Sequence, residues 1–214
     1  MIKVRIILIS ALTVFVVSAV AAASASAGTH QFTNNGVAIT GTLSVLSQGK
    51  LFLFIAGARI ITCHKVTDRG LVLTGGRDFT NEIHFLECLT GQAGCDVHSH
   101  GAPNGLILWS NIPTLLVDRE TSGGAKVIAD EFKSNPTTKE FVTLLFLALP
   151  GGSCSEYGTS SKVKGQIAAE AAGEELRFPE PELKGNTLEF FGVAAGLFGT
   201  ETQMYTNGSI LGVI

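Results

Sequence analysis

Four cysteines, all downstream of an apolar leader, constrain the fold of this chain more than any other sequence feature. Cys63 and Cys88 each lie in a strand-like run, Cys95 follows seven residues after Cys88, and Cys154 is the fourth. An even number of cysteines in an exported protein predicts disulfides. We expect Cys88–Cys95, which closes a short loop, and Cys63–Cys154, which joins distant strands. A zinc site is the alternative, but the sequence lacks the close Cys-x-x-Cys pairs typical of structural zinc.

The first 27 residues have the pattern of a signal peptide. A basic start precedes an uncharged apolar run over residues 6–23, and Ala25-Ser26-Ala27 supplies the small residues that signal peptidase reads. An uncleaved membrane anchor is the alternative, since about 18 apolar residues just span a bilayer. Cleavage after Ala27 leaves 13 basic and 18 acidic residues, a net charge of −5. This mild acidity argues against nucleic acid as a partner, and no later segment predicts a membrane span.

Residues 28–214 are enough for one compact domain with its own core. Strand-like runs, such as residues 51–55, alternate with turn signals, such as Gln48-Gly49 and Asp68-Arg69-Gly70. Short strands with frequent turns are typical of sandwiches and barrels. The sequence therefore predicts an all-β, single-domain antiparallel β-sandwich or barrel-like fold, linked by disulfides and secreted.

Two segments fit either a strand or a helix. Residues 136–149 begin and end with the proline and glycine signals of a helix, but their centre, Phe-Val-Thr-Leu-Leu-Phe-Leu, also suits a core strand. Residues 166–176 are rich in Ala and Glu and have the same ambiguity. The all-β surroundings favour strands in both.

Short motifs are scattered over most of residues 28–214: Ile61-Thr62-Cys63, Glu87-Cys88, Leu108-Trp109, Leu115-Leu116-Val117 and Glu182-Leu183-Lys184-Gly185-Asn186. With these motifs the chain resembles a group of uncharacterised secreted, cysteine-bearing β-rich proteins of soil bacteria. In that group proline often follows the tryptophan directly, whereas Ser110 follows Trp109 here. The resemblance implies secretion and a disulfide-linked β domain, and it implies no activity, ligand or catalytic residue.

The segment from Asp96 to His100 is the main candidate site. On a strand, His98 and His100 would point to one face, where imidazoles can share a metal ion, and Asp96 would join them. A complete site needs a further ligand, such as His64 or His84. The alternative is a polar loop beside a disulfide, in which Cys95 is oxidised and no cofactor is bound.

Other catalytic signals are weak. The sequence has no Gly-x-Ser-x-Gly elbow and no recognisable triad. Adjacent carboxylates, such as Asp130 and Glu131, face opposite ways on a strand, so we expect solvated strand ends there. Trp109, the single tryptophan, could anchor a carbohydrate or an apolar ligand, but core packing is the more common role.

These observations favour an exported, non-catalytic domain that acts outside the cell or at its surface by binding or as a structural component. The first alternative is a small secreted metal-dependent hydrolase that uses the His98/His100 region. The second is a β-barrel that binds an apolar ligand, which predicts a sizeable closed cavity.

Overall fold

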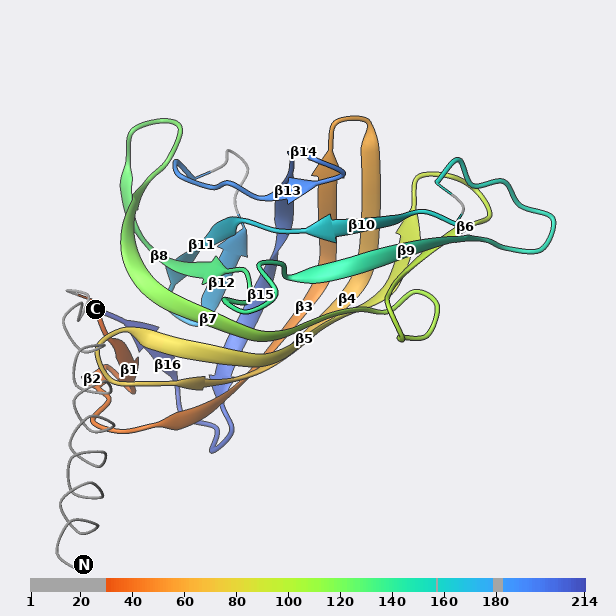
Figure 1. Cartoon of the computed structure of the whole chain (residues 1–214). Helices are drawn as coiled ribbons and strands as arrows, with labels where there is room; N and C mark the ends of the chain where they lie inside the picture. Colours follow the sequence, from red (N-terminus) through yellow and green to blue (C-terminus); the bar gives the residue numbers. More distant parts are fainter. Residues whose placement is uncertain (1–29, 157, 179–182) are drawn as a thin grey trace, which may run out of the picture.

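The computed structural model describes residues 30–156, 158–178 and 183–214, so the predicted signal peptide lies outside the described residues. Eight antiparallel strands form a closed barrel in the order β5-β4-β3-β15-β12-β11-β8-β7, and the pairing of β7 with β5 closes it (Figure 1). The barrel strands are β3 (Leu43–Ala56), β4 (Arg59–Val72), β5 (Arg77–Thr90), β7 (Ile107–Glu120), β8 (Lys126–Lys133), β11 (Gln166–Ala172), β12 (Glu175–Phe178) and β15 (Gly196–Tyr205). Of the two predicted all-β architectures, the barrel is confirmed.

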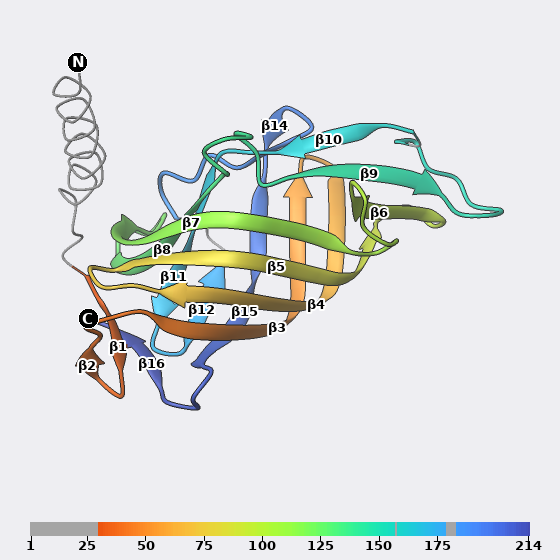
Figure 2. The same cartoon turned by 60° about the horizontal axis from the view of Figure 1, so that its bottom comes forward.

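The remaining strands extend the barrel at both ends (Figure 2). We call β6 (Cys95–Ser99), β9 (Val142–Ala148) and β10 (Ser160–Val163) the branch, because they continue the sheet beyond β5. At the opposite end lies a small sheet of β1 (Phe32–Asn34), β2 (Val37–Ala38) and β16 (Leu211–Val213). A two-stranded sheet, β13 (Glu189–Phe190) and β14 (Val193–Ala194), contacts β10. The described residues contain no helix that is long and apolar enough to cross a membrane.

Both ambiguous segments contain strands. The first contributes β9, which starts only at Val142. The residues before it form a turn, in which the Asn135 amide donates to the Glu140 carbonyl oxygen and the Lys139 amide donates to the Asn135 carbonyl oxygen. The second is the hairpin of β11 and β12, which turns at Gly173 with a φ of +66°. The preference for strands over helices is confirmed in both segments.

Two predicted turns lie instead inside long strands. Gly49 is in the middle of β3, where an added Cβ would lie 2.6 Å from the Thr200 carbonyl oxygen and 2.6 Å from Val66 Cγ1. Gly70 is in β4, where the register with β5 shifts between Arg69 and Gly70. Glycine is needed at position 49 for the close approach of neighbouring strands, so the prediction of a chain reversal there is wrong.

The barrel interior holds two separate apolar clusters. The larger lies toward the branch and is rich in aromatic side chains, including Phe52, Phe85 and Trp109. The smaller lies against the small sheet and includes Phe32, Tyr205 and Leu211. Tyr205 Oη donates a hydrogen bond to the Thr33 carbonyl oxygen at 2.9 Å, which ties β15 to β1.

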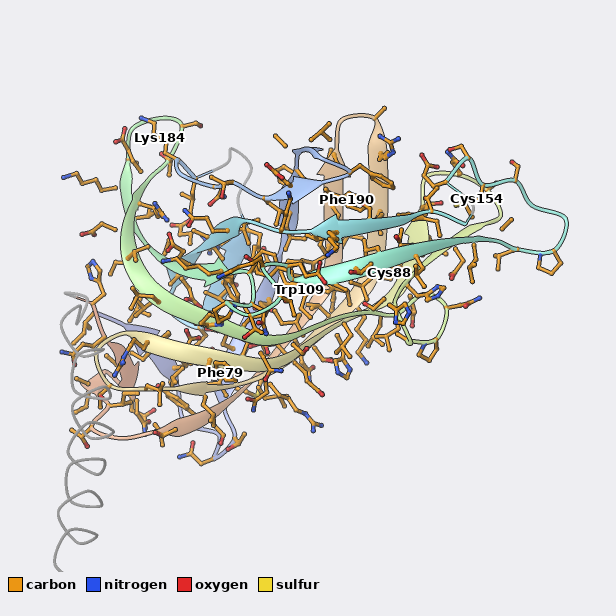
Figure 3. All side chains as sticks on the ribbon, in the orientation of Figure 1. Phe79, Cys88, Trp109, Cys154, Lys184 and Phe190 are labelled. Atoms are coloured by element: carbon orange, nitrogen blue, oxygen red, sulfur yellow. A yellow bond between two sulfur atoms is a disulfide. The ribbon has the colours of Figure 1, made fainter. Side chains whose placement is uncertain are left out.

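All four cysteines are disulfide-bonded, but the favoured pairing is wrong. Cys63 is bonded to Cys88, and Cys95 is bonded to Cys154. The register of β4 and β5 places Cys63 directly opposite Cys88, so the first bond joins adjacent strands. Cys95 begins β6 and lies opposite Ala148 of β9, which brings the loop after β9, with Cys154, within reach. Figure 3 marks one cysteine of each bond toward the branch end of the barrel.

Candidate functional site

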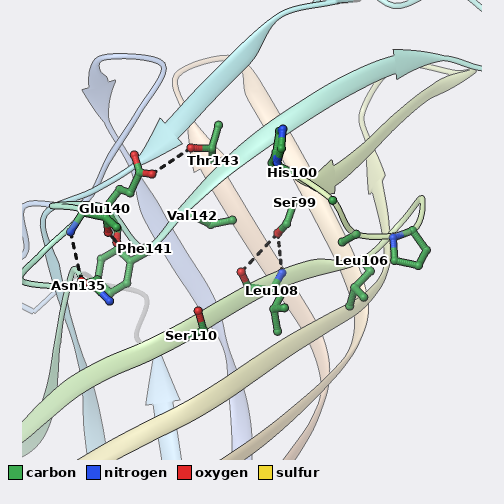
Figure 4. Close-up of a pocket in the computed structure, with 14 residues that line it drawn as sticks. Ser99, His100, Leu106, Leu108, Ser110, Asn135, Glu140, Phe141, Val142 and Thr143 are labelled. Atoms are coloured by element: carbon green, nitrogen blue, oxygen red, sulfur yellow. Dashed lines mark hydrogen bonds between the residues drawn. The ribbon is translucent and has the colours of Figure 1, made fainter.

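A pocket lies where the branch leaves the barrel. Strand β5 pairs with β7 from Arg77 to Phe85 and then with β6 at Leu89, so β7 and the branch separate from that point. The gap between β7 and β9 is bordered by the loop after β6 and by the turn before β9 (Figure 4). The pocket there has a volume of about 620 Å³. We call it the fork pocket.

Polar groups line much of the fork pocket. They are four hydroxyls, one amide, one imidazole and one carboxylate, from Ser99, Ser110, Thr138, Thr143, Asn135, His100 and Glu140. Several are fixed by local hydrogen bonds: the Leu108 amide donates to Ser99 Oγ at 2.7 Å, and Thr143 Oγ1 donates to Glu140 Oε1 at 3.2 Å. Lys162 Nζ lies 2.9 Å from Glu140 Oε2. The carboxylate is thus held in place by two partners.

Asn135 shapes the turn that forms one wall. Its Oδ1 accepts hydrogen bonds from the amides of Thr137 and Thr138 at 2.8 and 3.2 Å. Asparagine commonly stabilises turns in this way, by mimicking a backbone acceptor. The turn places Thr138 and Glu140 at the pocket.

The apolar wall consists of Leu106, Leu108, Pro103, Val142 and Phe141. The ring of Phe141 stacks on Trp109, with centroids 4.4 Å apart and planes 23° apart. Trp109 is only 1% exposed and packs edge-on against Phe54 and Phe85. The core role expected for Trp109 is confirmed, and the aromatic side chain that reaches the pocket is Phe141.

The predicted cluster of Asp96, His98 and His100 is only partly assembled. Asp96 and His98 are both buried on β6, with Asp96 Oδ2 and His98 Nδ1 3.1 Å apart. His100 lies beyond the end of β6 and is exposed at the fork pocket. His84 pairs instead with Glu82 at 3.1 Å. Among the residues that the structure describes, no three side chains of His, Cys, Asp or Glu are arranged to hold a metal ion.

A second polar group lies inside the barrel and was missed from the sequence. We call it the polar layer; its members are Ser47, Asp68, Asp78, Thr80, Thr114, Asp130, Glu201 and Gln203. Asp130 is 0% exposed and Glu131 4% exposed, so the expectation that these carboxylates are solvated is wrong. They do face opposite ways: Glu131 forms ion pairs with Arg119 and Lys133, whereas Asp130 turns inward. The signal in the sequence is spacing, since Asp130 is two residues from the core residue Phe132.

Burial raises the pKa of the acidic side chains in the polar layer. Burial, with a further contribution from the nearby charge of Asp130, raises the pKa of Asp68 to about 8. Burial also raises the pKa of Asp130 to about 7, although the neighbouring Thr114 and Asp78 side chains lower it. Burial and the nearby charges of Asp130 and Asp68 raise the pKa values of Asp78 and Glu201 well above their ordinary values. The four carboxyl groups therefore act on one another as one cluster.

No family model matches the sequence, and comparisons with curated proteins and with solved structures give no match.

Proposed function

We propose that this chain is an exported, non-catalytic binding domain whose fork pocket holds a small polyhydroxylated ligand, such as a unit of a carbohydrate. The observation that carries the proposal is the composition of the pocket. Hydroxyl and amide groups surround an apolar wall that contains an aromatic ring, and this combination suits a ligand with alternating hydroxyl and C–H surfaces.

Rigidity of the pocket supports a role in binding. Phe141 is fixed from behind by Trp109, and the hydroxyl of Ser99 and the carboxylate of Glu140 are held by hydrogen bonds. A site whose side chains are already ordered loses less conformational entropy when a ligand binds. Ser110, on β7, presents its hydroxyl to the same space from the barrel side (Figure 4).

The arrangement of ionisable groups favours binding over catalysis. The ionisable side chains that line the fork pocket are His100 and Glu140, and Figure 4 shows them at opposite ends. Acid–base catalysis of glycoside hydrolysis uses two carboxyl groups that flank one bond. Here the single lining carboxylate is held by Lys162 and Thr143.

Two alternatives have less support. A metal-dependent hydrolase at His98 would need that side chain at the surface, yet it is 6% exposed and paired with Asp96. An apolar ligand inside the barrel would compete with the aromatic cluster and would contact the acidic polar layer. Export itself is supported by the apolar leader, and the two disulfides are compatible with it.

The test is binding of the protein, with residues 28–214, to an array of immobilised oligosaccharides, followed by calorimetry with each bound sugar. The variant Ser110→Trp fills the pocket from β7 and should abolish binding. Ser44→Trp is the matched control, because Ser44 is an exposed position in β3 away from the pocket, and it should bind normally. Mass spectrometry of each sugar after incubation should show it unchanged. Absence of any sugar binding, equal binding by Ser110→Trp, or cleavage of the sugar would contradict the proposal.

A further inference from the structure

The polar layer separates the two apolar clusters of the barrel. Strand pairing places its members side by side: Ser47 lies opposite Asp68 on β4 and opposite Gln203 on β15. Thr114 of β7 lies opposite Asp78 of β5. Along β7, Thr114 lies between Ile112 of the larger apolar cluster and Leu116 of the smaller one at a spacing of two, so the layer crosses an otherwise apolar interior.

No basic side chain neutralises this layer within the described part of the chain. Ion pairs of the described residues involve none of Asp68, Asp78, Asp130 and Glu201. The charges that shift the pKa values of Asp68, Asp78 and Glu201 all come from other members of the layer. An isolated ionised carboxylate in such a place is costly, and a group of them is more so.

The other barrel strands do not supply a countercharge. Strands β11 and β12 contribute Ala169, Ala171 and Leu176 to the interior next to the layer. Tyr205, the next inward residue after Gln203 on β15, is titratable, but burial raises its pKa to about 12. The remaining members are the neutral side chains of Ser47, Thr80, Thr114 and Gln203, from β3, β5, β7 and β15.

Several oxygens of the layer also have no hydrogen-bond donor among the described residues. They are Asp68 Oδ1, Asp78 Oδ1, Asp130 Oδ1 and Oδ2, and Glu201 Oε1. The fully buried Ser47 Oγ, next to Asp68 in the register, is likewise unpartnered. A proton on a carboxyl group creates the missing donor, and Asp78 and Asp130 are close enough to share one.

We propose that the polar layer is a proton-dependent lock on the barrel, which stays closed while its carboxyl groups hold protons and loosens when they are lost. In the unfolded chain these groups lose their protons near pH 4. In the barrel Asp130 and Asp68 keep theirs until about pH 7 and about pH 8. The folded state binds more protons over this window, so stability is greatest at its acidic end and falls as the pH rises.

The experiment is thermal unfolding of the disulfide-bonded protein at pH 5.0, 6.5 and 8.5 at constant ionic strength. For the unmodified chain we expect the melting temperature to fall by on the order of 10 °C across this range. Asp130→Asn and Asp68→Asn replace a proton-binding carboxyl with a neutral amide of the same shape, so each should show a smaller fall. Glu174→Gln is the matched control on an exposed turn and should show the full fall.

If either Asp130→Asn or Asp68→Asn fails to fold, the other variant still provides the comparison. The unmodified chain by itself tests the expected fall in melting temperature. A melting temperature that does not fall between pH 5.0 and 8.5 would overturn the proposal, as would a full fall in the folded Asn variants. The melting temperature at pH 8.5 should also be measured with added calcium. If stoichiometric calcium binding restored the melting temperature at pH 8.5, and Asp130→Asn or Asp68→Asn abolished that binding, the layer would be a cation site instead.

Discussion

Phe141 and Trp109 form one stacked pair that belongs to both the core and the fork pocket, with ring centroids 4.4 Å apart. Trp109 lies in the aromatic cluster of the barrel, and Phe141 lines the pocket. The pair links the stability of the barrel to the shape of the candidate binding site. Changes at Phe141 should therefore alter both properties.

Phe141→Ala should lower the free energy of unfolding by about 3–5 kcal/mol, because it removes a buried aromatic ring and leaves a cavity. Urea unfolding followed by the fluorescence of Trp109, the single tryptophan, measures this loss. Phe141→Leu is the milder control and should cost less. Equal stability of Phe141→Ala and the unmodified chain would show that the stacked pair contributes little.

The Cys63–Cys88 bond closes a segment with a sequence separation of 25, and the Cys95–Cys154 bond closes one of 59. Replacing each pair by alanines should lower the free energy of unfolding by about 3.5 and about 4.2 kcal/mol, respectively, in the chain-entropy model. Urea unfolding of the two double variants tests the order. Non-reducing peptide mapping tests the pairing directly, and a Cys88–Cys95 peptide would contradict the structure.

Gly49→Ala should destabilise the barrel by roughly 1–3 kcal/mol, the usual cost of overpacking. The new methyl group would lie 2.6 Å from both Thr200 O and Val66 Cγ1. Gly41→Ala is the control, because an added Cβ there meets no atom within 4 Å. Thermal unfolding of the two variants should show a loss only for Gly49→Ala, and similar melting temperatures would refute the close-contact explanation.

Glu201→Gln should raise the free energy of unfolding at pH 8 by roughly 1–3 kcal/mol, with little change at pH 4. Burial and the charges of Asp68 and Asp130 raise the pKa of Glu201, so the folded state resists the loss of its proton as the pH rises. A neutral amide removes that penalty. Urea unfolding at the two pH values tests the sign, and a loss of stability at pH 8 would contradict it.

The sequence was sufficient for the all-β character of the chain and for the presence of disulfides, but not for every turn, since Gly49 and Gly70 lie inside β3 and β4. Alternating residues and turn signals predicted strands, and an even cysteine count after a predicted signal peptide predicted disulfides. The pairing itself depends on register: Cys63 meets Cys88 only because β4 and β5 are aligned at that position. Likewise, closure of the barrel by β5 and β7 is a contact between distant segments that local patterns do not encode.

The candidate sites show the same limit. His100 and Trp109 were candidate site residues in the sequence. His100 lines the fork pocket, and Trp109 stacks on Phe141, which also lines it. Phe141 and the polar layer were missed because their roles depend on which strand face is turned inward. Asp130 illustrates this: its spacing of two residues from Phe132 puts both side chains on one face of the strand, but only the fold shows that this face is turned inward and that Asp130 is 0% exposed.

The pairing of β1 with β16 has a consequence for how the chain could be re-engineered. Gln31 and Ile214 exchange two backbone hydrogen bonds, of 2.8 and 2.9 Å, so the first and last described strands are already neighbours. A short glycine-rich linker between these positions would turn the chain into a ring, and new ends could be opened at the exposed turn around Gly123. Such a circular permutant would retain every strand contact of the barrel. Its strands would follow one another in a different order along the chain but would keep the same neighbours in space.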